Sequence, residues 1–190
     1  MSIPRREILA GFLAIRSARG QRPRKRIILM LGPPGSGKTT QSERLKSALG
    51  LPVVSMPDML QSEGASIQVS DEVANLLLRK RITRKDCELG FILDGYPLTA
   101  KQAEYFEALL TELGLPSPAV IHLSITDYEV DRRLANRGRV EDSPANTELR
   151  IVMYRKQAEL LMPRYPNAIT VDASKPPDKV AARIRQALGY

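Results

Sequence analysis

The chain of 190 residues contains one cysteine, one histidine and no tryptophan. A single cysteine, Cys87, excludes a framework of intramolecular disulfides, and we expect a reducing, cytoplasmic location. His122 has no cysteine cluster near it, which excludes a zinc site of ordinary ligand spacing. We therefore interpret both residues as packed in the core, and we expect any bound metal to be a hard cation held by oxygen atoms.

Long apolar runs are missing as well. Hydrophobic residues make up 43% of the chain, which suits a packed core, but no run approaches the roughly 20 residues that a membrane-spanning helix needs. We expect a protein without a membrane span, and the length corresponds to one domain.

Acidic residues are scarce at the start of a chain whose net charge is +8. Residues 1–26 contain seven arginines and Lys25 against one acid, Glu7. This basic arm, residues 1–25, has three interpretations. It packs on the domain or stays solvated, it directs the protein to an organelle, or it contacts nucleic acid or another anionic partner. A secretory signal is excluded because Arg16 interrupts the apolar stretch.

After the arm, short apolar runs alternate with longer stretches of helical pattern. This alternation predicts a parallel sheet that is covered on both faces by helices. The predicted strands are 26–31, 51–55, 90–94, 119–125 and 168–172, and the predicted helices are 38–49, 70–82, 99–113, 127–137, 147–164 and 177–188. We expect residues 26–190 to form one doubly wound α/β domain, with a five-stranded parallel sheet in three layers, α/β/α.

A glycine-rich loop follows the first predicted strand. Residues 32–39 read GPPGSGKT and fit G-x-x-x-x-G-K-[ST] at every fixed position. In such a P-loop, backbone N–H groups and the positive end of the following helix face phosphate oxygens. The spacing therefore predicts a bound nucleoside triphosphate, with Lys38 on the outer phosphates and the Thr39 hydroxyl as a ligand of Mg²⁺.

One carboxylate, Asp94, ends the third apolar run. The carboxyl ends of parallel strands line the ligand crevice of a doubly wound sheet, so we expect Asp94 to face the magnesium and the phosphates. A helix-capping role at the turn is the alternative interpretation.

Several segments, in this order, make the chain similar to the adenylate kinases and related nucleoside monophosphate kinases. They are GPPGSGKTT, VSDEVANLLLRKRI (69–82), CELGFILDGYPLTAKQA (87–103), RRLANRGRVED (132–142) and DASKPPDKV (172–180). The resemblance covers roughly residues 26–188. It implies a P-loop NTPase fold and the transfer of the γ-phosphoryl group of Mg-ATP to a nucleoside monophosphate, AMP foremost. By analogy with short-lid relatives we expect a monomer.

The resemblance also implies roles for particular residues. Arg133, Arg139 and Arg150 are implied to act on the transferring phosphoryl group, together with Lys38 and Asp94, because arginine forks suit charge that spreads over phosphoryl oxygens. The alternative is a charged helix face that makes surface ion pairs. A short lid is expected at about 137–146. The residues implied to hold the donor nucleotide are Gly35, Ser36, Gly37, Lys38, Thr39, Thr40, Arg133, Arg137 and Lys175.

On the acceptor side the chain departs from the family pattern. The family continues its third strand as D-G-[FY]-P-R, whereas Leu98 follows the proline here, and Gln61 replaces the arginine of T-G-D-M-L-R. The acceptor region, about 56–69, is also shortened. Loss of one partner of a desolvated charge pair costs roughly 3–5 kcal/mol, so we expect a weaker grip on the acceptor phosphate. The nearby cations that can compensate are Arg79, Lys80, Arg81, Arg84 and Lys101.

The residues implied to recognise the acceptor base are retained. Gln102 matches the position that reads adenine, and Val69 matches a residue of the base pocket. The remaining residues implied around the acceptor are Asp58, Gly95 and Tyr96.

These observations leave three hypotheses of function. The first is an adenylate kinase-like phosphotransferase, and the second is a nucleotide-binding sensor or interaction module whose acceptor site has degraded. The third is a P-loop kinase of a small non-nucleotide acceptor, since one scaffold serves several acceptors.

Overall fold

The computed structural model describes residues 25–64, 69–137 and 143–190. The basic arm, except for Lys25, and the centre of the expected lid, including Arg139, lie outside these residues. The five strands form one parallel sheet in the order β2-β3-β1-β4-β5. Their bounds are β1 Arg26–Leu31, β2 Val53–Ser55, β3 Gly90–Asp94, β4 Ala119–Ser124 and β5 Ile169–Asp172.

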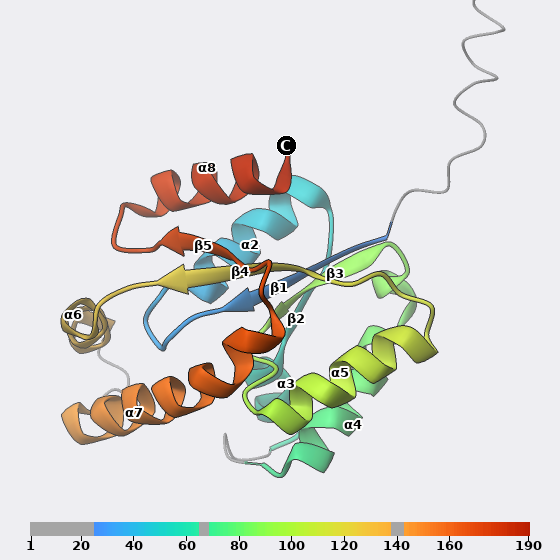
Figure 1. Cartoon of the computed structure of the whole chain (residues 1–190), viewed down its shortest axis with the longest axis horizontal. Helices are drawn as coiled ribbons and strands as arrows, with labels where there is room; N and C mark the ends of the chain where they lie inside the picture. The colour runs from blue at the N-terminus through green and yellow to red at the C-terminus, as the bar shows by residue number, and fades with distance from the viewer. Residues whose placement is uncertain (1–24, 65–68, 138–142) are drawn as a thin grey trace, which may run out of the picture.

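Helices cover both faces of the sheet, which confirms the three-layer α/β/α prediction (Figure 1). One face is covered by α2 (Lys38–Leu49) and α8 (Pro177–Leu188). The other is covered by α3 (Met56–Ser62), α4 (Asp71–Ile82), α5 (Ala100–Glu112) and α7 (Pro144–Leu161), while α6 (Asp127–Arg137) lies beyond the carboxyl end of β4. Two short 3₁₀ helices, η1 (Lys85–Cys87) and η3 (Met162–Arg164), complete the described elements.

Successive residues of the central strand β1 serve two different cores, because side chains alternate across a strand. Ile27, Leu29 and Leu31 belong to the core beneath α3, α4 and α5. Ile28 and Met30 belong to the core beneath α2 and α8. Both sets are buried, so β1 is fixed between two apolar layers, and the loop that follows it starts from a rigid support.

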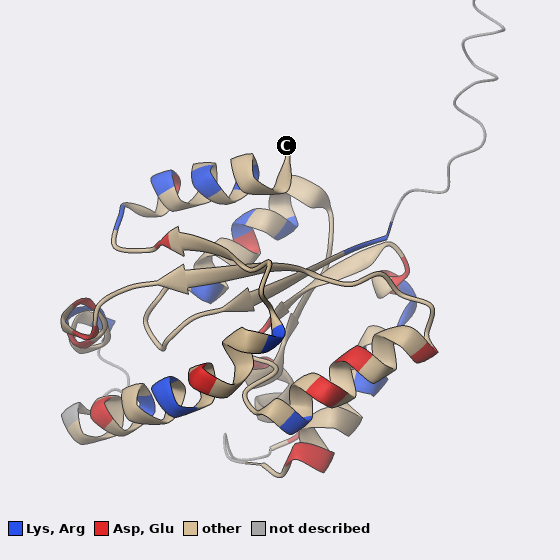
Figure 2. Cartoon of the chain, in the orientation of Figure 1, with Lys and Arg blue, Asp and Glu red and all other residues tan. Residues whose placement is uncertain are grey.

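Charged residues are almost absent from the strands (Figure 2). Arg26 begins β1, whereas Asp94 and Asp172 end β3 and β5. Parallel strands bring their carboxyl ends to one edge of the sheet, so both carboxylates lie at the edge where β1 leads into the P-loop.

The sequence did not predict α3. Its N-cap is Ser55, whose hydroxyl accepts a hydrogen bond from the Asp58 backbone at 3.3 Å, and Pro57 lies in its first turn. These are strong helix-start signals, but seven residues are too few to show a helical period. Similarly, α7 begins at Pro144 rather than at residue 147, since Ser143 and Pro144 provide an earlier start.

In the part of the chain that the structure describes, no helix combines the length and the apolar character that crossing a membrane requires.

Candidate active site

The P-loop spans the connection between β1 and α2. Gly32 has φ of +147°, and a Cβ atom there would lie 2.7 Å from the Leu123 carbonyl oxygen, so this position needs glycine. The Lys38 ammonium donates to the carbonyl oxygens of Gly32 at 2.8 Å and Pro33 at 2.9 Å. Lys38 thus folds back over the loop, at the positive N-terminal end of α2, where an anion is favoured.

Asp94 reaches the same loop from β3. The Thr39 hydroxyl donates to an Asp94 carboxylate oxygen at 2.7 Å. Asp94 is buried, and this burial raises the pKa of its carboxyl group, while the Lys38 charge and the Thr39 hydrogen bond oppose the rise. Asp94 thus contacts the P-loop side of the sheet through Thr39, and its role toward magnesium and phosphates stays a prediction.

Thr39 and Asp94 together offer hard oxygen ligands. Mg²⁺ is usually bound by one or two carboxylates together with substrate phosphates and waters rather than by an all-protein cage. No group of three or more His, Cys, Asp or Glu side chains with metal-binding geometry occurs among the described residues. The donor set at Thr39 and Asp94 fits a magnesium ion that arrives with its nucleotide.

Several cations converge on the loop. Burial lowers the pKa of Lys38 to about 8, the charge of Asp94 opposes this, and the positive charges of Arg150 and Arg137 lower it further. Arg150 lies on α7 and Arg137 ends α6, so helices from two parts of the chain direct positive charge at Lys38. The charge of Asp94 acts on Lys38 within this cluster, and the phosphates of a bound nucleotide would add further negative charge.

Arg133 lies on the β5 side of the loop. Its guanidinium donates to the carbonyl oxygens of Ala173 at 2.7 Å and Gly35 at 3.4 Å, and to Glu129 at 2.7 Å. Lys175 is exposed nearby and forms an ion pair with Asp172 at 3.6 Å. Arg133 therefore connects α6, the P-loop and the segment after β5, the segments to which the sequence assigned the donor nucleotide.

The remaining predicted donor residues also lie at the loop. Ser36 is buried, and its hydroxyl has no hydrogen-bond partner among the described residues. Thr40 is exposed in the first turn of α2. A buried hydroxyl without a partner is unusual, and it is consistent with a loop that is completed by its ligand.

On the acceptor side, Gln102 is buried and engaged within the protein. Its amide donates to Asp71 at 2.9 Å and accepts from the Leu98 backbone at 2.7 Å. The Thr99 hydroxyl donates to the same Asp71 oxygen at 3.0 Å. This network ties the start of α4 to the start of α5. Sequence reasoning missed Asp71, although it follows the helix-capping Ser70 within a matched segment.

The other predicted acceptor residues lie around the same turn. The Tyr96 hydroxyl is 2.6 Å from Asn75 Oδ1 and 2.9 Å from the Gln102 carbonyl oxygen. Gly95 faces Pro57, whose Cδ would be 2.8 Å from a Cβ atom at that position. Asp58 is close enough to Asp94 for its charge to raise the pKa of Asp94. Val69 packs against the core beneath α4.

The two positions where the family has arginine are open to solvent. Leu98 is 43% exposed, and Gln61 is exposed near the end of α3. Neither side chain carries a charge, so neither can form an ion pair with an acceptor phosphate.

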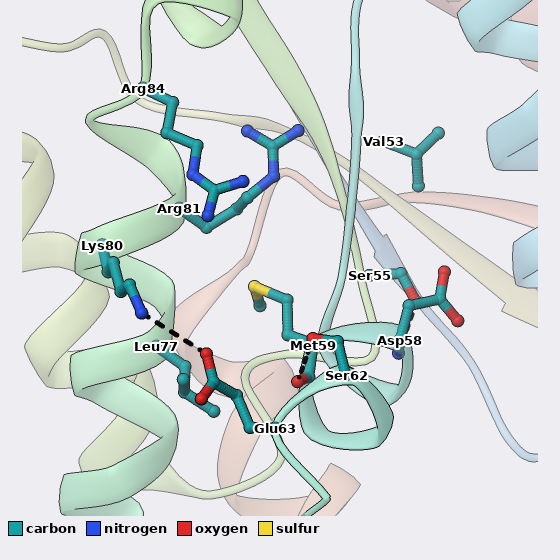
Figure 3. Close-up of a pocket in the computed structure, with 10 residues that line it drawn as sticks. All are labelled: Val53, Ser55, Asp58, Met59, Ser62, Glu63, Leu77, Lys80, Arg81 and Arg84. Atoms are coloured by element: carbon teal, nitrogen blue, oxygen red, sulfur yellow. Dashed lines mark hydrogen bonds and ion pairs between the residues drawn. The ribbon is translucent and has the colours of Figure 1, made fainter.

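Three of the five candidate substitute cations point into a pocket between α3 and α4 (Figure 3). The pocket has a volume of about 230 Å³ and is lined by Val53, Ser55, Asp58, Met59, Ser62, Glu63, Leu77, Lys80, Arg81 and Arg84. Arg81 binds Asp86 through two hydrogen bonds of 2.8 and 3.0 Å, and Lys80 lies 3.4 Å from Glu63. Lys80 therefore contacts the residue after α3, and Arg81 contacts η1.

The two other cations are also directed elsewhere or exposed. Arg79 forms a bidentate ion pair with Glu112 of α5, and Lys101 is exposed in the first turn of α5. The predicted compensation for the missing arginines stays a prediction, and Arg81 and Arg84, which line the same pocket as Asp58, are the cations placed to provide it.

The sequence predicted that His122 and Cys87 pack in the core. Cys87 is buried, as predicted. His122 is only half-buried, and its Nε2 lies 3.0 Å from the Tyr154 hydroxyl of α7. It lines a second pocket of about 430 Å³, which lies between Pro33 of the P-loop, the start of α6 and α7. A lone histidine within an apolar run gave no signal of this partner.

Comparison with known proteins agrees with this geometry. Residues 62–170 match the family model described as adenylate kinase. An adenylate kinase of Stenotrophomonas maltophilia is 37% identical over 183 residues, which cover 85% of this chain and 98% of that protein. Adenylate kinases of Mycobacteroides abscessus and Micrococcus luteus are each 34% identical, cover 85% of this chain, and are covered over 98% and 89% of their own lengths.

Proposed function

The chain belongs to the adenylate kinase family and is a nucleoside monophosphate kinase that uses ATP, and we propose that its acceptor is AMP. A phosphate oxygen of AMP forms a bond to the γ-phosphorus of ATP, and the bond to the β–γ bridging oxygen breaks, so that two molecules of ADP result. The hypotheses of a binding module and of a non-nucleotide acceptor have no support from the relatives, each of which is an adenylate kinase.

The observation that carries this proposal is the convergence of Lys38, Arg137 and Arg150 at the P-loop. Phosphoryl transfer needs little covalent help from protein, and catalysis consists mainly of positioning and charge stabilisation. We assign the β- and γ-phosphates to Lys38 and to the backbone N–H groups of Gly35, Ser36 and Gly37. Thr40, Arg133, Arg137 and Lys175 complete the donor site in this proposal.

We further assign Mg²⁺ to Thr39 and Asp94, whose oxygen atoms lie 2.7 Å apart. When bound, the ion neutralises phosphate charge as it develops. Asp94 is buried, accepts the hydrogen bond of the Thr39 hydroxyl and interacts with the Lys38 charge. Arg150, and Arg139 by resemblance, act on the oxygens of the transferring phosphoryl group.

For the acceptor, we assign the base to Gln102 and Val69, near Gly95, Tyr96 and Asp58. The Gln102 amide donates one N–H to Asp71 and accepts one bond from the Leu98 backbone, which leaves a second N–H and a second oxygen lone pair for adenine. Because Leu98 and Gln61 provide no charge, we expect AMP to bind more weakly than ATP. Expectations of a monomer and of a cytoplasmic location stay predictions.

The test measures ADP formation from Mg-ATP with AMP, CMP, UMP, GMP and dAMP in separate reactions. A Lys38→Ala variant removes the proposed phosphate contact. Lys46→Ala removes an exposed lysine of the same helix, whose ammonium forms an ion pair with Glu43. We expect ADP formation with AMP in the wild type and in Lys46→Ala but not in Lys38→Ala. ATP binding without turnover of any monophosphate would overturn the proposal.

A further inference from the structure

His122 stands at the side of the P-loop that faces β4. It pairs in register with Leu31, the residue directly before Gly32. The Gly32 carbonyl oxygen in turn accepts a hydrogen bond from Lys38. His122 is therefore one strand away from the start of the loop that holds Lys38.

Tyr154 meets His122 from α7. The Tyr154 hydroxyl and the His122 Nε2 atom are 3.0 Å apart, and both side chains are half-buried. Burial and the Lys38 charge lower the pKa of His122, and burial raises the pKa of Tyr154 to about 12. Both groups are thus neutral at neutral pH, and they share one neutral hydrogen bond whose donor is set by the histidine tautomer.

This bond spans a pocket rather than a packed interface. The pocket of about 430 Å³ is lined by Pro33 of the P-loop, by Ile125 and by Arg155, among others. On either side of it α7 is held by apolar contacts, through Ile151 against α6 and through Leu161 in the large core. Between these two anchors, the hydroxyl of Tyr154 is a polar link from the helix to the sheet.

The same helix carries Arg150, exactly four positions before Tyr154 and so one turn away on the same face. The Arg150 charge acts on Lys38. The position of this part of α7 relative to β4 therefore determines how closely the Arg150 charge approaches the P-loop. The apolar contact of Ile151 holds the helix against α6, and the hydrogen bond adds a link from the helix to β4 that fixes this distance.

We propose that His122 and Tyr154 form a positioning pair, which holds α7, and through it Arg150, at the distance from the P-loop that phosphoryl transfer requires. The inference rests on the proposed function, because it takes Arg150 to act on the transferring group. Neither side chain of the pair touches the reacting atoms. They act through the helix.

The first test compares Tyr154→Phe, which deletes only the hydroxyl, with His122→Leu and with the double variant, using ATP and AMP at steady state. We expect each single variant to lower kcat about tenfold, as for the loss of one hydrogen bond, with the KM for ATP changed less than about twofold. The double variant should fall no further than either single one, because the same bond is lost. His122→Gln, whose amide can still bond the hydroxyl, should recover most of the lost kcat.

The matched control is Tyr128→Phe, which removes the hydroxyl of a tyrosine that is 78% exposed on α6 and should leave kcat unchanged. A kcat for Tyr154→Phe within twofold of the wild type overturns the proposal. The proposal is also overturned if the two single-variant decreases in kcat multiply in the double variant. It is overturned as well if each decrease in kcat is explained by a smaller fraction of folded protein. A wild type that forms no ADP refutes the proposed function instead.

A second test does not depend on turnover. Hydrogen exchange of the α7 amides should become several times faster in Tyr154→Phe than in the wild type, and should be unchanged in Tyr128→Phe. Equal exchange rates in Tyr154→Phe and the wild type would show that the bond does not hold the helix, and would overturn the inference even if the enzyme proved inactive.

Discussion

The Thr39 hydroxyl donates a hydrogen bond of 2.7 Å to the Asp94 carboxylate, although the two residues are 55 positions apart in the chain. The contact joins the first turn of α2 to the last residue of β3. It brings together the two oxygen atoms that we propose for Mg²⁺ and, through Asp94, the charge that opposes the lowered pKa of Lys38. The site therefore depends on the parallel pairing of β1 with β3, which aligns Met30 with Asp94.

The first prediction concerns Asp94→Asn. Asparagine keeps the shape and still accepts the Thr39 hydrogen bond, but it loses the charge that would hold a magnesium-bound water and balance Lys38. We expect kcat to fall about 100-fold, in the range seen for outer-shell partners of metals, and the far-UV circular dichroism to stay unchanged. Asp178→Asn, at an exposed residue paired with Arg44, is the control. Activity of Asp94→Asn within twofold of wild type would contradict the assignment.

The second prediction concerns Lys38 and pH in the metal-free, nucleotide-free protein. Burial lowers the pKa of Lys38 from 10.5 to about 8. Between these values the unfolded state binds more protons than the folded state, so unfolding free energy rises with pH. From pH 7.5 to 9.5 the gain from this group is about 2 kcal/mol, and it is measured as the difference between wild type and Lys38→Met in denaturant titrations.

ATP affinity should fall from pH 7.5 to 9.5, because the neutral Lys38 amine no longer attracts phosphate. Isothermal titration at pH 7.5 and pH 9.5 measures this. A wild type whose stability rises no more than that of Lys38→Met would show that the Lys38 pKa is close to its ordinary value.

The third prediction restores a cation on the acceptor side. Leu98→Arg places a guanidinium at an exposed position next to the Gln102 network. A charge-assisted hydrogen bond contributes about 1.5–3 kcal/mol, so the KM for AMP should fall about 10- to 100-fold while the KM for ATP stays unchanged. Leu89→Arg, at a position that is 55% exposed at the other end of β3, adds the same charge and should have no effect. Equal effects of both variants would point to general attraction by net charge.

The fourth prediction tests the pairing of β1 with β3. Gly90 has φ of +122°, and a Cβ atom there would lie 1.8 Å from the Arg26 carbonyl oxygen. Gly90→Ala must therefore separate the two strands, and we expect a loss of about 3 kcal/mol or more in unfolding free energy. Gly114→Ala, with φ of +60° and no neighbour within 4 Å, should lose only about 1 kcal/mol. Urea unfolding compares the two, and a smaller loss at Gly90 would contradict the argument.

The strands and most helices were predictable because their periodicity is long and regular. The helix 38–49 was predicted at its observed bounds, and the helix 127–137 likewise. The short helix α3 was not, because a cap and a proline mark its start but no period follows. Local chain signals thus identified most helices and strands, and the P-loop spacing predicted where the phosphates bind.

Side-chain partners were beyond the reach of the sequence. Nothing in the chain indicated that the Gln102 amide would be held by Asp71, or that Lys80 and Arg84 would line the α3–α4 pocket. Such pairings depend on how two helices are rotated about their axes, which propensity and spacing do not specify. The sequence correctly indicated which acceptor positions lost their charge, since that needs only residue identity.

Arg26 and Tyr190 lie at the edge of the sheet opposite the P-loop. Burial raises the pKa of the Tyr190 phenol, and the charges of Arg185 and Arg26 oppose that rise, so the charge at the beginning of β1 acts on a residue just after α8. A tether joined at either position would immobilise the enzyme in one orientation, with the nucleotide cleft facing away from the support. Substrate diffusion to the P-loop would then be as free in the anchored enzyme as in solution.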